Sequence, residues 1–133
     1  MSRWLSTFLK GMLLAGFVHG AFGGACSSST TPDAPVVDVA KINEGAQNVE
    51  TAFASGDLSK VQTVLTETAR AVHKDDLASL TADNMRAFAA DFKARSLDHY
   101  SKNYAEFSFP WKDTRYIVSF ARQDDGSYKL RTF

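Results

Sequence analysis

Histidines and short motifs are the first places to look for chemistry, and both are sparse here. His73 and His99 stand far apart, and a metal site would need a third ligand brought to them by folding. We interpret both as exposed or helix-capping residues. The sequence has no Gly-x-Ser-x-Gly, phosphate-loop, His-Glu-x-x-His or calcium-loop pattern. We therefore predict no catalytic residue, no cofactor and no metal ion.

Two adjacent carboxylate pairs, Asp75-Asp76 and Asp124-Asp125, are the next candidates. Neighbouring residues do not face each other on a helix or a strand, so neither pair is suited to share a proton. We interpret the first pair as charge at a helix end and the second as part of a hairpin turn.

The first 25 residues have the pattern of an export signal. Arg3 and Lys10 are the only charges before Asp33, and residues 11–22 are apolar apart from one histidine. This run is shorter than the roughly 20 apolar residues that a membrane-spanning helix requires. A basic start, a short apolar stretch and small residues at its end predict a signal peptide over residues 1–25.

The single cysteine follows directly after that stretch. The sequence Gly23-Gly24-Ala25-Cys26 resembles the lipobox of bacterial lipoproteins, although Gly23 replaces the leucine-like residue usual at its position. The resemblance implies cleavage before Cys26, a diacylglycerol on its thiol and an acyl chain such as palmitate on its amine. The resemblance also implies that Ser27, directly after the cysteine, directs the protein to the outer membrane, facing the periplasm. Plain secretion with cleavage near Ala25 is the alternative.

Residues 26–35 read CSSSTTPDAP and contain no apolar anchor, so they predict a solvated tether. Composition limits the rest to one globular domain over residues 36–133. The chain has 133 residues, a formal net charge of 0, 44% hydrophobic and 23% charged residues. This balance gives no electrostatic case for binding nucleic acid.

The first two thirds of the domain have helical periodicity. Three amphipathic segments begin near Val36, at Asp57 and at Thr81, where the aspartate and the threonine suit helix N-caps. We expect Leu77 and Leu80 to lie in a connection and to fill the core. The expected inward residues are Val39, Ile42, Ala46, Val49 and Phe53, then Leu58, Val61, Val64, Leu65 and Val72, then Met85, Phe88, Ala89 and Phe92.

From Tyr100 onward the period changes to two, which is typical of strands. Three segments alternate inward and outward residues, with turns at 111–114 and 124–127. The sequence therefore predicts an α+β domain of about three N-terminal helices packed on a curved antiparallel sheet of three to four strands. The expected inward residues are Phe107, Phe109 and Trp111, then Tyr116, Val118 and Phe120, then Tyr128 and Leu130.

Two segments of this domain resemble the small nuclear transport factor 2-like family, which has a cystatin-like α+β cone. They are the stretch from Phe53 to Asp57 before a helix, and the ending from Tyr116 to Phe133 with its Asp-Gly turn. The resemblance covers about residues 46–133 and implies an exported lipoprotein of the uncharacterised type. The family includes isomerases, dehydratases, carriers and scaffolds, so the fold does not fix the activity.

In isomerase-like members of that family, a carboxylate and a tyrosine project into an apolar cone. Asp91, Tyr100, Tyr104 and Tyr116 could supply such groups here. No position matches a catalytic motif of the family, so we interpret Asp91 as solvated and the tyrosines as core residues with hydroxyls at the rim.

Three functions remain open at this point. The first is a membrane-anchored envelope lipoprotein that acts as a non-enzymatic protein-interaction or scaffolding module, bound to an envelope protein or to a second copy through the sheet. The second is a carrier of a small apolar ligand, and the third, less favoured, is an isomerase-like enzyme. The candidate pocket of the carrier comprises Phe88, Phe92, Tyr104, Phe107, Phe109, Trp111, Tyr116 and Phe120.

The basic residues of the strands allow two interpretations. We expect Arg115, Arg122, Lys129 and Arg131 to share the outer face of the sheet, solvated and protecting its edges from pairing. A patch for anionic lipid or cell-wall polymer is the alternative.

Overall fold

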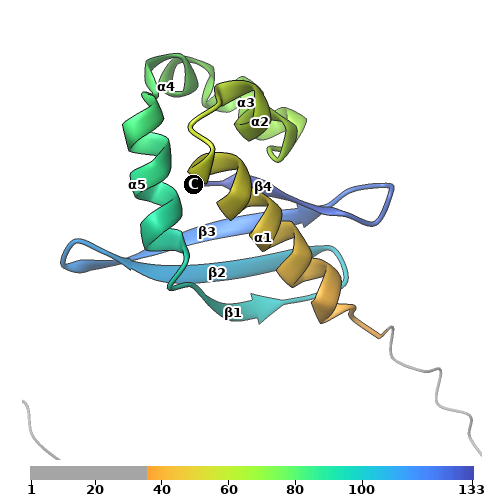
Figure 1. The fold of residues 1–133 in the computed structure, drawn as a ribbon. Helices are drawn as coiled ribbons and strands as arrows, with labels where there is room; N and C mark the ends of the chain where they lie inside the picture. The colour runs from red at the N-terminus through yellow and green to blue at the C-terminus, as the bar shows by residue number, and fades with distance from the viewer. Residues whose placement is uncertain (1–35) are drawn as a thin grey trace, which may run out of the picture. The chain divides into compact units, whose positions relative to one another are not determined.

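The described part of the chain is an α+β domain with helices followed by a four-stranded antiparallel sheet (Figure 1). The computed structural model describes residues 36–133. The predicted signal peptide, Cys26 and the tether lie outside these residues. The predicted fold class is confirmed. The elements are α1 Val39–Ala54, α2 Leu58–Thr63, α3 Glu67–Val72, α4 Lys74–Ser79, α5 Ala82–Phe92, β1 Ser96–Tyr100, β2 Tyr104–Trp111, β3 Thr114–Arg122 and β4 Tyr128–Thr132.

The longest helix, α1, crosses one face of the sheet as its periodicity predicts. Asp38 caps its start by accepting a hydrogen bond from the main-chain N–H of Lys41. Ile42, Ala46, Val49 and Phe53 are buried. These confirmed positions fix which side of the helix faces the strands.

The second predicted helix is instead two short helices, because a strand-like contact interrupts it. Leu65 forms a single parallel bridge to Leu130 of β4. The N–H of Thr66 donates to the carbonyl of Leu130, and the N–H of Leu130 donates to the carbonyl of Val64, both at 2.9 Å. Thr66 then caps α3, and Val72, expected inside, is 69% exposed.

The segment predicted as a connection contains a further helix, α4. Its Leu77 is buried, as expected, and Leu80 is partly buried against the core. Thr81 caps α5, whose Met85, Ala89 and Phe92 are buried as predicted. Residues 36–133 therefore form five helical segments where about three were expected.

The sheet follows chain order, β1-β2-β3-β4, and its register confirms the predicted alternation. Trp111 pairs with Thr114 across the turn between β2 and β3. The first strand, β1, was not predicted as a separate element. A register irregularity between Leu97 and His99 disturbs its alternation, which explains why the sequence pattern did not reveal it.

Candidate functional site

The helix-facing side of the sheet holds most of the predicted aromatic pocket, and its rings contact one another. Phe92 of α5 lies 5.4 Å from Phe109 between ring centroids, and Phe107 lies 5.3 Å from Phe120. Phe88 lies 5.6 Å from both Phe92 and Phe109. These are the distances of packed aromatic pairs, so the five rings occupy the space between α5 and the sheet.

Of the other three residues of the candidate pocket, Tyr116 contacts Phe109 at 5.5 Å on the edge of the ring cluster, and two lie elsewhere. Trp111 is 41% exposed near the tip of the β2–β3 hairpin, in an edge-to-face contact of 5.0 Å with Tyr116. Tyr104 has the opposite strand parity to the buried Ala105 and faces away from the helices. The eight residues therefore do not surround one hollow.

No described helix packs on the opposite side of the sheet, which we call the uncovered sheet face. It is mostly polar, whereas the aromatic side is covered by the helices. A dimer through the sheet was expected because an open aromatic face would be a large apolar patch. In the described domain the helices cover that face, so this reason does not apply. The face comprises Ser96, Asp98 and His99 of β1, Tyr104, Glu106, Ser108 and Pro110 of β2, Arg115, Ile117, Ser119 and Ala121 of β3, and Lys129, Arg131 and Thr132 of β4.

Arg115 lies across two neighbouring strands on this face. Its Nε donates to Ser108 Oγ and its Nη2 donates to Asp98 Oδ2, each at 2.7 Å. The hydrogen bond from Ser108, together with Arg115 and against a smaller effect of burial, lowers the pKa of Asp98 below its ordinary value. Ser108 is only 4% exposed on a face that no described helix covers.

Further hydrogen bonds on this face lie within β2 and between β3 and β4. Tyr104 donates to Glu106 Oε2 at 2.7 Å, and this acceptor carboxylate, with burial, raises the pKa of the Tyr104 hydroxyl. Ser119 donates to Thr132 at 3.0 Å. Ile117 is 52% exposed beside these polar groups. The uncovered sheet face therefore has one exposed apolar side chain surrounded by polar side chains that hydrogen bonds hold in place.

Three of the four basic residues expected together share this face, and one does not. Arg115, Lys129 and Arg131 lie on it, with Lys129 opposite Ala121. Arg122 pairs with the buried Tyr128 and has the parity of the helix side. The expectation that Arg122 shares the outer face is therefore wrong.

The carboxylate and tyrosine set considered for proton transfer is dispersed. Asp91 is half-buried on α5, and Tyr104 lies on the other side of the sheet. Tyr100 is exposed at the end of β1. Tyr116 lies on the helix side of the sheet, as α5 does, and its ring contacts Phe109 and Trp111. Neither Asp91 nor Tyr116 lines the surface hollows beside the β2–β3 hairpin, between α1 and the β3–β4 hairpin, or at the start of α1.

The remaining titratable candidates lie at the ends of elements. The His73 ring contacts Phe133 in a tilted arrangement with 4.6 Å between the ring centroids, whereas His99 is exposed. Asp75 and Asp76 occupy the first turn of α4. Asp125 accepts hydrogen bonds from the Oγ and N–H of Ser127 at 2.6 and 2.9 Å, which lower its pKa.

Within residues 36–133, no three His, Cys, Asp or Glu side chains are grouped as metal ligands.

Several hollows lie on the surface of the domain. One of about 500 Å³ borders the β2–β3 hairpin, and one of about 210 Å³ lies between α1 and the β3–β4 hairpin. Neither is lined by Phe92, Phe107 or Phe120. None of the helices in residues 36–133 is long and apolar enough to cross a membrane.

Comparison with protein-family models, with curated proteins and with solved structures found no match. The likeness to the nuclear transport factor 2-like family and the lipobox therefore stay predictions from the sequence.

Proposed function

We propose that the chain is a membrane-anchored envelope lipoprotein whose α+β domain is a non-enzymatic protein-interaction module. The anchor is supported by Gly23-Gly24-Ala25-Cys26 after an export signal, followed by the tether of residues 26–35. Two or more acyl chains at Cys26 would hold the protein firmly at a bilayer.

The uncovered sheet face supports the proposal that the domain binds another protein. Hydrogen bonds already hold Arg115 and Tyr104, so a partner that contacts them does not have to order their side chains. Ile117 supplies exposed apolar area among them. Arginine, tyrosine and a buried apolar centre are common in protein interfaces.

The alternatives have less support. An apolar ligand carrier needs a hollow among the rings, but Phe92, Phe107, Phe109 and Phe120 contact one another and are buried. An isomerase-like enzyme needs a carboxylate and a tyrosine in one apolar cavity, and Asp91 and Tyr104 lie on opposite sides of the sheet.

Site-specific photo-crosslinking in the intact host tests the docking face. A photoreactive residue in place of Ile117 is expected to give one reproducible protein adduct, and the same residue in place of the exposed Val72 of α3 is expected to give none. An adduct to a second copy of the chain would identify the homodimer. Equal labelling from both positions, or no adduct from either, would contradict docking on this face.

A further inference from the structure

A separate group of cations lies where the tether enters the domain. The tether-end hollow has a volume of about 160 Å³ and receives side chains from the start of α1, the β1–β2 connection and the end of β3. It contains three cations and one carboxylate. Its lining residues are Val36, Val37, Asp38, Lys41, Lys102, Arg122 and Tyr128.

The one carboxylate of the hollow, Asp38, caps the start of α1. Asp38 accepts from the main-chain N–H of Lys41 as the cap of α1. The four ion pairs found within residues 36–133 involve none of Lys41, Lys102 and Arg122. None of the three cations therefore forms an ion pair within the described domain, and they outnumber the one carboxylate of the hollow.

Two of the cations approach the same point of the neighbouring hairpin. A Cβ built on Gly126 would lie 3.3 Å from Arg122 Nη2 and 3.5 Å from Lys41 Nζ. Both cations therefore lie beside the same residue, where like charges repel each other and a bound anion would relieve that repulsion. The nearby carboxylates, Glu44 and Asp125, border the adjacent hollow of about 210 Å³, and Asp125 is turned toward Ser127.

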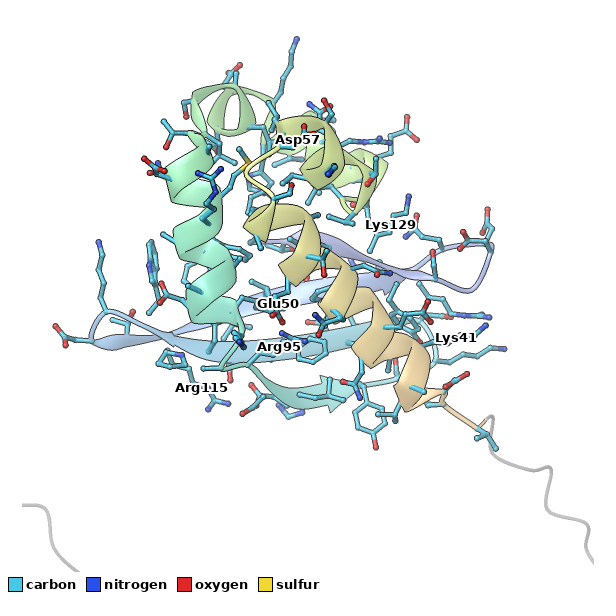
Figure 2. All side chains as sticks on the ribbon, in the orientation of Figure 1. Lys41, Glu50, Asp57, Arg95, Arg115 and Lys129 are labelled. Atoms are coloured by element: carbon cyan, nitrogen blue, oxygen red, sulfur yellow. The ribbon has the colours of Figure 1, made fainter. Side chains whose placement is uncertain are left out.

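The position of the hollow within the fold indicates what it faces. Val36, which is 91% exposed, joins the tether to the domain. The ten residues from Cys26 to Pro35 reach about 30 Å when extended, so a lipid anchor keeps this end close to the bilayer. The β2–β3 hairpin lies at the opposite end of the sheet, and Lys41 and Arg115 lie toward these two ends (Figure 2).

We propose that Lys41, Lys102 and Arg122 bind the phosphates of anionic lipid headgroups in the membrane that carries the anchor. The proposal rests on the proposed function for its orientation. Cations beside a membrane are attracted to anionic lipid over about a Debye length, so the contact requires the hollow to face the bilayer. The domain then sits with the start of α1 toward the membrane and the β2–β3 hairpin away from it.

Vesicle co-sedimentation tests the proposal without the lipid anchor. The chain from Ser27 onward, which contains every described residue, is mixed with vesicles of phosphatidylcholine alone or with about 30% phosphatidylglycerol added. We expect binding to the anionic vesicles alone, and loss of it when salt is raised from about 50 to 300 mM.

Two double variants with the same change of charge localise the contact. Lys102→Glu with Arg122→Glu is expected to weaken binding about tenfold, and Lys129→Glu with Arg131→Glu on the uncovered sheet face less than about threefold. Melting temperatures confirm that both variants fold. A smaller or equal loss in the first pair would overturn the proposal, as would no binding to anionic vesicles.

Two further results separate this proposal from others. Thermal stabilisation by inorganic phosphate without vesicle binding would assign the cations to a free anion and overturn the lipid contact. Because this chain lacks the lipid, its result is independent of whether Cys26 is acylated, and fractionation of Cys26→Ala tests the anchor by itself.

Discussion

Leu65 and Leu130 form a one-residue parallel bridge that fastens the helical layer to the outer strand of the sheet. Both residues are fully buried, and two main-chain hydrogen bonds flank the bridge. The bridge gives the edge of β4 a partner and ends α2 at the same place. Thr66 follows immediately and caps the start of α3. The contact between Leu65 and Leu130 therefore sets the boundary between α2 and α3.

Loss of the Thr66 cap is expected to lower the free energy of unfolding. Thr66→Ala removes the acceptor for the N–H of Ala69, now 3.1 Å from Oγ1, and should cost about 1–2 kcal/mol. Thr66→Ser should restore most of it, and Thr63→Ala at an exposed position should cost less. Urea unfolding measures all three, and equal effects at positions 63 and 66 would contradict the cap.

Gly45→Ala tests how closely α1 approaches β4. Alanine favours a helix over glycine by about 1 kcal/mol, so propensity alone predicts stabilisation. A Cβ at Gly45 would however lie 2.6 Å from the carbonyl oxygen of Tyr128, which is main chain and cannot rotate away. We expect destabilisation by about 2 kcal/mol in urea unfolding. A gain in stability would show that the helix and strand are farther apart.

The ring cluster predicts a cost for truncating Phe92. Phe92→Leu should lower stability by about 1–2 kcal/mol, and Phe92→Ala by about 3–5 kcal/mol, because the surrounding rings cannot close the space. Calorimetric melting of the two variants beside Phe88→Leu, at a partly buried position, measures the difference. Unchanged melting of Phe92→Ala would instead favour a loosely filled, ligand-sized interior.

The ion pair between Arg95 and Glu50 joins α1 to the chain after α5 (Figure 2). Arg95 also donates to the carbonyl of Phe92 and to Gln47. Arg95→Lys cannot reproduce these forked contacts and should cost about 1–2 kcal/mol, as should Glu50→Gln. The double variant should cost less than the sum of the two. A fully additive result in urea unfolding would contradict the coupling.

Acid should weaken the uncovered sheet face through Asp98. Its pKa is lower in the folded protein than the ordinary 3.8, so its contribution is present above that value and is lost as the pH falls through the folded pKa. Between about pH 4 and pH 2, Asp98→Asn should therefore flatten the loss of melting temperature, and Asp113→Asn should not. Identical acid limbs for Asp98→Asn and the native chain would contradict the contact with Ser108 and Arg115.

Much of the fold could be predicted because its periodic residues are also its buried ones. Ile42, Val49 and Phe53 of α1, and Phe107 and Phe109 of β2, follow single patterns over whole elements. The break at Leu65 could not be read in this way, because Leu130 lies far along the chain and overrides local helix periodicity.

The site was less accessible to sequence reasoning for a related reason. Strand alternation places Glu106 and Ser108 on the uncovered sheet face, but Asp98 joins Arg115 only through β1, whose irregular register disturbs the period-two signal. The tether-end hollow depends on segments far apart in the sequence meeting in space. No spacing in the sequence predicts that Lys102 and Arg122 lie close to the start of α1.

We propose that Cys26 holds the domain at a membrane, and fractionation of the host envelope with intact mass measurement tests this anchor. We expect a chain that begins at Cys26, carries the mass of attached lipid and leaves the membrane fraction only with detergent. Cys26→Ala should move to the soluble fraction. A Cys26→Ala protein that stays in the membrane fraction, or a native chain without added lipid mass, would contradict the account.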